Sequence, residues 1–489
     1  MTAAAKGTAG QADLRPWLGA FLLLIALEVL LAPFASPMGI AAVLWLCTAA
    51  LIVERRFGLW TLLTMLACLS LPQALAAYVT RVPFGIFVAD LAVIPLLAAA
   101  VVRVLRTRVI PPYLLHFVAI VAAGVALTAY GVLGDNAFFD AVGVFRRICV
   151  YPLVFLAAVV LLQTTAPSLV TLERMVLAAA GVIGLIVAWR LVTGQGYAHE
   201  YMEGLGVPDR YLSHLESVGL IFAMILGLGH VATDRQYKGR WLVFVGLGLV
   251  CLVASNYRTV WLAFVIAATV WAWTSDQSSG RLMVIGFIAL GLAIGIATLV
   301  VWQVDPTSLA VERFSVDNLR RGMNWRWGSW TRAVEVFLES PIFGTGFGYR
   351  HEFEYVTGRN FDVVHMSRGH TIHNDLLWLL VNGGVVGTGL VLTLHLRWWG
   401  RCLRALSGFN RQTPEARFIS AALATHVAAI MLSMFQPFFS SPAPVVAIHL
   451  IMGIALVLAI RLERQAQRVS LPQDRVVPTT RSIAGARTA

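Results

Sequence analysis

Charged residues are scarce in this sequence. Only 13% of its 489 residues are Asp, Glu, Lys or Arg, and 58% are hydrophobic, whereas an average soluble domain has about 25% charged residues. So few charges cannot cover the surface of a water-soluble protein of this length. The composition therefore excludes a soluble globular chain and indicates a membrane protein.

Several sequence motifs are also missing. The five cysteines lie singly, with no Cys-x-x-Cys spacing, so neither a zinc site nor redox chemistry is expected. No repeat of fixed period is visible. The net charge of +12 could indicate nucleic acid as a partner, but the basic residues form short clusters at the ends of apolar stretches. We therefore interpret them as topology signals and expect no nucleic-acid partner.

Long apolar stretches dominate the chain. About fourteen of them, each of about 16 to 23 residues, recur between Trp17 and Ile460, and each is long enough as a helix to cross a bilayer. Helices satisfy all their backbone hydrogen bonds internally, as the bilayer interior requires. The sequence predicts an all-α polytopic membrane protein with about 12–14 transmembrane helices.

Alternation of the spans gives an orientation and four segments. With both termini in the cytoplasm, about 23 of the basic residues lie inside and about 14 outside, as the positive-inside rule requires. The segments are an N-terminal helix bundle, a large periplasmic loop that is partly helical, C-terminal helices, and a cytoplasmic tail of disordered composition, which cover residues 1–303, 304–372, 373–461 and 462–489. The expected location is the bacterial inner membrane.

The large loop contains a tryptophan-rich helix and a glycine-rich turn. Residues 318–340 have apolar side chains at helical spacing, with arginines between them, and Pro341 ends the helix. Trp330 on this helix fits either a binding site or an anchor at the headgroup level. The turn with Gly344 and Gly346 could bring amides to a phosphate, although a plain turn is the more frequent use. It lacks the Lys-Ser/Thr of a nucleotide P-loop.

Two histidines follow at the outer membrane boundary. His370 and His373 precede an apolar span, and an imidazole there can take a proton from an attacking hydroxyl. The alternative is a residue that merely ends the helix. His365 and Asp375 lie nearby, but no His-Glu-x-x-His pattern is present, so no metal is expected.

Three arginines on the outer side suit a phosphate ligand. Arg258 lies at the boundary of two short spans, Arg210 in an outer loop, and Arg326 on the tryptophan-rich helix. A guanidinium fork engages two phosphate oxygens at once, and arginine is costly near the bilayer core unless a partner or substrate is there. Ordinary snorkelling or surface exposure is the alternative for each.

Together these residues resemble the O-antigen ligase family, which also includes polymerases and related oligosaccharide transferases. The resemblance covers roughly residues 190–400. Its segments are His373-Asn374 with the later Gly384-Val385-Val386-Gly387, Arg326 and Trp330 leading into Ser340-Pro341-Ile342-Phe343-Gly344-Thr345-Gly346, and Ser255-Asn256-Tyr257-Arg258-Thr259. One departure is Asn382, where many relatives carry an acid.

The resemblance implies glycan transfer from an undecaprenyl diphosphate-linked donor to a hydroxyl acceptor at the periplasmic face, without metal or cofactor. Arg210, Arg258 and Arg326 would neutralise the diphosphate leaving group, and His373 would activate the acceptor hydroxyl. A single displacement would invert the anomeric centre. Supporting roles fall to five residues: Asn374, His370, Trp330, Gly344 and Gly346.

Several functions stay open within and outside this family. Ligation of a polysaccharide to lipid A core is the first, and a polymerase or a protein O-oligosaccharyltransferase would use the same site. A lipid or sugar transporter would need polar groups along a membrane path. The spans contain few such groups, mainly Glu28, Asp90, His116 and His426, and no duplicated halves are visible.

Overall fold

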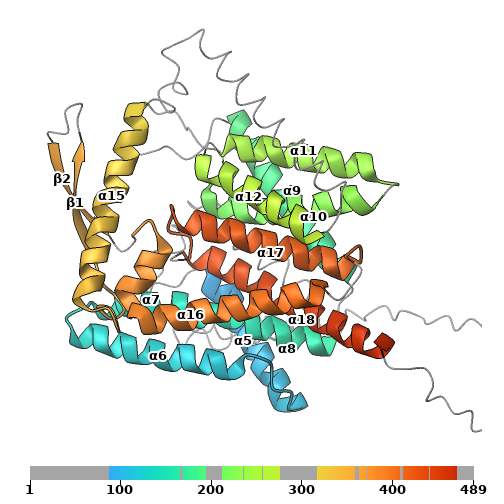
Figure 1. Cartoon of the computed structure of the whole chain (residues 1–489), viewed down its shortest axis with the longest axis horizontal. Helices are drawn as coiled ribbons and strands as arrows, with labels where there is room; N and C mark the ends of the chain where they lie inside the picture. Colours follow the sequence, from blue (N-terminus) through green and yellow to red (C-terminus); the bar gives the residue numbers. More distant parts are fainter. Residues whose placement is uncertain are drawn as a thin grey trace, which may run out of the picture.

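The computed structural model describes ten stretches of the chain, in which helices dominate (Figure 1). These stretches are residues 88–165, 169–193, 212–234, 236–255, 257–275, 316–357, 363–369, 372–407, 411–439 and 441–470. The predictions for Arg210, for His370 and for residues 1–87 and 276–303 of the N-terminal segment therefore lie outside the described residues.

The described elements before the large loop are helical. They are α5 (Val88–Thr107), α6 (Leu114–Leu133), α7 (Phe138–Phe145), a π-helical turn (Arg146–Val150), a 3-10 turn (Tyr151–Leu153), α8 (Val154–Thr165), α9 (Leu169–Thr193), α10 (His214–Thr233), α11 (Lys238–Ala254) and α12 (Arg258–Ser275).

The large loop contributes α15 (Val316–Glu339) and an antiparallel hairpin of β1 (His351–Thr357) and β2 (Val363–Gly369). Three helices follow: α16 (Asp375–Ser407), α17 (Pro414–Ser433) and α18 (Pro442–Ser470). The last helix continues through residues 462–470, which the sequence assigned to the tail. In Figure 1, α15 and the hairpin lie across one end of the bundle, and the long helices run side by side away from them.

Seven helical spans among the described residues are long and apolar enough to cross a membrane. They are Leu114–Leu133, Phe138–Gln163, Leu172–Thr193, Glu216–Thr233, Asp375–Ser407, Pro414–Ser433 and Pro442–Gln467. The prediction of an all-α polytopic membrane protein is confirmed. The small hairpin was not predicted.

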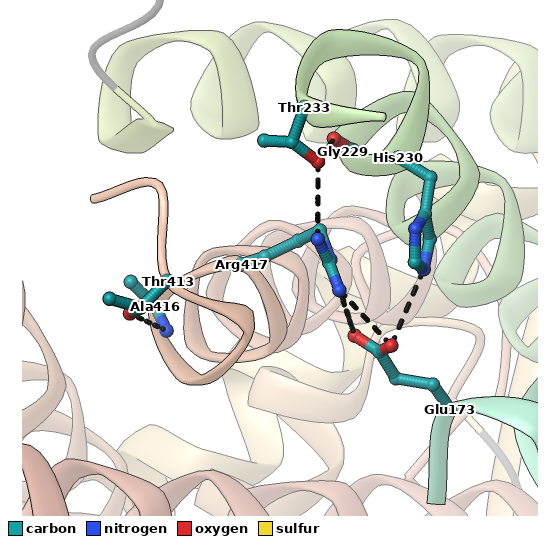
Figure 2. A network of polar contacts seen from close by, with 7 residues as sticks. All are labelled: Glu173, Gly229, His230, Thr233, Thr413, Ala416 and Arg417. Carbon is teal, nitrogen blue, oxygen red and sulfur yellow. Dashed lines mark hydrogen bonds and ion pairs between the residues drawn. The ribbon is translucent and has the colours of Figure 1, made fainter. Parts of the chain in front are cut away.

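One end of the bundle, here called the Glu173 end, is held by a buried charge network (Figure 2). Arg417 at the start of α17 donates two hydrogen bonds to one carboxylate oxygen of Glu173 on α9, at 3.2 and 2.9 Å, and one to the other oxygen at 3.1 Å. Arg417 also donates to Thr233 on α10, and His230 reaches Glu173 at 3.3 Å. Three helices are therefore tied together by complementary charges.

The opposite end, here called the α15 end, contains the end of α9 and the start of α10. Ser213 and Glu216 form a capping box at the start of α10, with bonds of 3.1 and 2.8 Å, because a Ser-x-x-Glu sequence satisfies two amides of the first turn. Arg190 at the end of α9 donates to both oxygens of Glu216, at 3.0 and 3.1 Å. The ends of α9 and α10 are therefore fixed together here.

A break in α16 holds the glycine-rich turn against the bundle. Gly384 has φ 59° and ψ −164° inside the helix, a conformation that only glycine adopts readily. The amides of Val385 and Val386 donate to carbonyls of the turn, those of Pro341 and Ile342, at 2.9 and 3.2 Å. The break therefore lets the backbone of α16 pack directly against the backbone of the glycine-rich turn, without side chains between them.

Candidate active site at the α15 end

The first turn of α16 carries the candidate base. The side-chain oxygen of Asn374 accepts hydrogen bonds from the amides of Leu376 and Leu377, both at 3.1 Å. Asparagine is a preferred N-cap because its side chain satisfies amides that have no partner within the helix. Asn374 therefore starts the helix and holds His373 just outside it.

His373 lies between the tryptophan-rich helix and α16. Its ring packs edge-on against Trp325, with centroids 4.6 Å apart and planes at 81°. Burial, and secondly the positive charge of Arg326, lowers the pKa of His373 to about 4, because both disfavour the imidazolium form. At neutral pH the imidazole is therefore uncharged and can accept a proton. Its contact with α15 brings two of the predicted site residues, His373 and Arg326, into one environment.

The β-hairpin fixes the position of α15. His351 on β1 is buried, and its Nε2 lies 3.1 Å from Ser329 Oγ and 3.0 Å from the Ser329 carbonyl oxygen. Phe353, two residues along the same face of the strand, packs against Trp325 with centroids 5.2 Å apart. A Cβ atom at Gly328 would come 2.5 Å from the Glu354 carbonyl oxygen. Glycine there permits the close approach that presents Trp325 to His373.

Trp330 lies one turn further along α15. Its ring is 6.1 Å from that of Phe435, which follows the end of α17. Its buried indole N–H has no hydrogen-bond acceptor among the residues that the structure describes. The side chain therefore joins α15 to the α17–α18 connection, consistent with either an anchor or a binding role.

Arg258 begins α12 at the same end of the bundle. The last turn of α12 meets the start of α17, where Arg411 donates to the Thr274 carbonyl at 3.3 Å. Since α12 and α17 pack along each other, the opposite ends of these helices lie together as well. Arg258 therefore lies near the end of α17, in the region that Trp330 contacts through Phe435.

The glycine turn has a structural explanation. The amides of Gly344, Thr345 and Phe347 donate to the carbonyls of Ser340, Val381 and Leu127, at 2.8, 2.8 and 3.0 Å. Gly344 and Gly346 have φ of 68° and 78°, and a Cβ on either would collide with the backbone of α16 or α6. These three amides are used within the fold, which favours the plain turn over a phosphate cradle.

The sequence did not single out Arg147. It belongs to the π-helical turn after α7, and such turns are frequent at functional sites. Its guanidinium lies 5.9 Å from the centre of the Trp378 ring, in the first turns of α16, and its Nε donates to the Gly143 carbonyl. The neighbouring Arg146 pairs instead with Asp90 at 3.0 Å. The available signal was arginine at a span boundary, which had singled out Arg258.

Asn382, the departure from the family pattern, is buried in α16. Its amide nitrogen donates to the Trp378 carbonyl at 2.9 Å. A neutral side chain that bonds its own helix carries no proton-transfer role here. Among the described residues, no group of three or more His, Cys, Asp or Glu side chains could hold a metal ion.

The helices and this arrangement define a multi-pass membrane protein with a candidate site at one end of its bundle. Residues 243–392 match the family model described as O-antigen ligase. This segment includes α12, α15, the hairpin and the first half of α16, so the predicted resemblance to the O-antigen ligase family is confirmed over these residues. No curated protein matches the chain.

Proposed function

We propose that the protein transfers a glycan from an undecaprenyl diphosphate-linked donor to a hydroxyl of lipid A core at the periplasmic face of the inner membrane. The family assignment supports glycan transfer of the ligase or polymerase type. The observation that carries the site is the neutral imidazole of His373, held against Trp325 beside the cationic Arg326.

The reaction is a single displacement. The acceptor oxygen forms a bond to the anomeric carbon while the bond from that carbon to the diphosphate oxygen breaks, and the diphosphate leaves with the electron pair. His373 takes the acceptor proton, and Arg326, Arg258 and Arg210 stabilise the leaving group. A bound diphosphate raises the pKa of His373 above its value of about 4 in the free protein, because nearby negative charge favours the imidazolium.

The distribution of basic residues supports a periplasmic site. Outside the large loop, the described arginines and lysines are concentrated at the Glu173 end, whereas the α15 end has Arg146, Arg147, Arg190 and Arg258. Those at the Glu173 end include Arg103, Arg106, Arg108, Arg174, Lys238, Arg240, Arg397, Arg401, Arg404, Arg411, Arg417, Arg461 and Arg464. Short basic loops stay in the cytoplasm. In this orientation the α15 end faces the periplasm, where a lipid-linked glycan presents its sugar after crossing the membrane.

The test is transfer by the purified full chain in lipid nanodiscs, with lipid-linked glycan as donor and lipid A core as acceptor. We expect His373→Ala to lower kcat by about 10²- to 10⁴-fold, the usual contribution of a general base. Arg258→Ala should lower kcat/KM by about tenfold to a hundredfold, because charged hydrogen bonds contribute about 1.5–3 kcal/mol. Arg404→Ala, an exposed arginine of α16, is the control and should transfer normally.

Two outcomes would contradict the proposal. Wild-type turnover by His373→Ala would remove the base, and extension of the donor glycan without any gain of mass by the core lipid would indicate a polymerase. Transfer should continue in EDTA. Loss of transfer in EDTA, with restoration by one divalent ion, would instead require a metal.

A further inference from the structure

A cleft of about 340 Å³ lies at the far end of α15 from His373. Tyr130 and Leu133 at the end of α6, Glu339 at the end of α15, and Thr345 of the glycine turn are among its lining residues. Trp325, which contacts His373, is 14 residues before Glu339, and at 1.5 Å per residue the cleft is about 20 Å from it along the helix. The cleft is therefore separate from the site described above.

The polar groups of the cleft are hydroxyls and a carboxylate. The Glu339 side chain is 69% exposed, and Arg332, the basic side chain that reaches it, lies at 3.9 Å but pairs more closely with Glu335 at 3.1 Å. None of the residues that line the cleft is an arginine, lysine or histidine. A carboxylate is a hydrogen-bond acceptor only, so it accepts from hydroxyl groups and repels phosphate.

The apolar parts of the cleft complement these groups. Tyr130 lines the cleft and is half exposed. The C–H face of a sugar can pack against an aromatic ring, and the tyrosine hydroxyl can donate or accept a hydrogen bond. The volume is at the lower end of the range for small-ligand sites, about 300–1,000 Å³. An aromatic face beside a carboxylate in a small cleft is suited to one or two neutral sugar units.

The rim of the cleft indicates how such a ligand is carried. Leu133, which lines the cleft, is 85% exposed. Leu338 and Phe343, the sequence neighbours of the lining residues Glu339 and Gly344, are 66% and 53% exposed. Leu133 ends the exposed face of the membrane-spanning α6, on which Leu115 and Val125 are also exposed. Because this apolar face continues to the cleft, a saccharide attached to a lipid can reach it while its chains stay in the bilayer.

We propose that this cleft is a saccharide subsite, which holds a neutral sugar unit of a lipid-anchored glycan about 20 Å from the reacting bond. The proposal rests on the proposed glycan transfer for the identity of its ligand. Two sources share this chemistry: the donor glycan and the sugars of the acceptor. The subsite would hold one of them in place while its reacting group meets His373.

The first experiment measures binding without catalysis. The probes are the oligosaccharide released from the lipid-linked donor and the core oligosaccharide freed of lipid A by mild acid, each added to the full chain in detergent and followed by saturation-transfer NMR. We expect one probe to bind wild-type protein, and its signal to be lost in Glu339→Gln and in Tyr130→Ala. The probe that binds identifies the source.

The matched controls are Glu335→Gln and Phe139→Ala, which change an exposed carboxylate and an exposed aromatic ring outside the cleft. Both should bind the probe as wild type does. In the transfer assay, Glu339→Gln should raise KM for the matching substrate by about tenfold with kcat unchanged, since a hydrogen bond to a charged group is lost away from the reacting bond. Tyr130→Phe should stay near wild type, because the ring remains.

The outcomes separate the two proposals. Cleft variants that bind and turn over like their controls would overturn the subsite, even if wild-type protein transfers glycan normally. Absence of transfer by wild-type protein, together with probe binding that depends on Glu339 and Tyr130, would overturn the proposed reaction and leave the subsite in place. If neither probe binds to wild-type protein, the subsite is also overturned.

Discussion

Arg417 and Arg326 lie at opposite ends of the bundle and have different surroundings. Arg417 is bound by both oxygens of Glu173 and by Thr233, so its charge is cancelled where it holds helices together (Figure 2). The charge of Arg326 acts on the imidazole of His373 and lowers its pKa. The guanidinium of Arg417 thus holds helices together, whereas the charge of Arg326 acts on a titratable side chain of the candidate site.

The comparison also shows that pairing alone does not distinguish the two ends. The α15 end has its own buried pair, Arg190 with Glu216, which fixes the ends of two helices. What distinguishes the α15 end is α15 with its hairpin, which lies across the helix ends and places Trp325 against His373.

Loss of Arg417 should strongly destabilise the Glu173 end. Arg417→Met should cost about 3–5 kcal/mol, because it leaves the buried Glu173 without its main counter-charge. Glycan transfer per folded molecule should stay at the wild-type level. Thermal unfolding in detergent and the transfer assay measure the two, with the exposed Arg404→Met as control. A large loss of turnover in folded Arg417→Met protein would show that the Glu173 end takes part in the reaction.

The next effect concerns the break in α16. Gly384→Ala should destabilise the protein by about 2 kcal/mol or more, because alanine at φ 59° is strained and its Cβ would collide with the turn at Ile342. Gly389→Ala, five residues later in the same helix, meets no atom within 4 Å and should be neutral or slightly stabilising. Equal stability of the two variants in thermal unfolding would contradict the packing of the turn into the break.

The smallest effect is on the pH profile. His373 can accept a proton only when its imidazole is neutral. The pH dependence of kcat/KM reports the pKa values of the free protein. It should therefore fall only as the pH drops through about 4, the lowered pKa of His373. Arg326→Gln removes one of the two causes of that shift, so the fall should begin at a higher pH, nearer the ordinary value of about 6.5. An unchanged profile would mean that Arg326 does not act on His373.

Local sequence signals predicted the elements of the site well. Helical spacing over residues 318–340 matches α15 (Val316–Glu339) closely, and Asn374 and His373 mark the start of α16. These features depend on residues that are neighbours in sequence. The multi-span fold could be predicted for the same reason, because the length and apolarity of a span are properties of consecutive residues.

The contacts between distant segments could not be predicted. The glycine turn bonds to Val381, some 36 residues later, through Thr345, and no periodicity records such a pairing. The hairpin was missed because its short strands lie within a polar loop. Arg147 reaches Trp378 across the fold, so its sequence position alone gave only the arginine pair at a boundary.

In the proposed mechanism the reaction takes place at the α15 end, and this end faces the periplasm. The direct test places single cysteines at the exposed Trp327 of α15 and the exposed Ser407 at the end of α16, in protein whose native cysteines are replaced. A membrane-impermeant maleimide is added to cells with a permeabilised outer membrane. Labelling at position 327, with position 407 labelled only after lysis, is the predicted result. Labelling at 407 and not at 327 would contradict it, because the imidazole and the arginines would then face the cytoplasm.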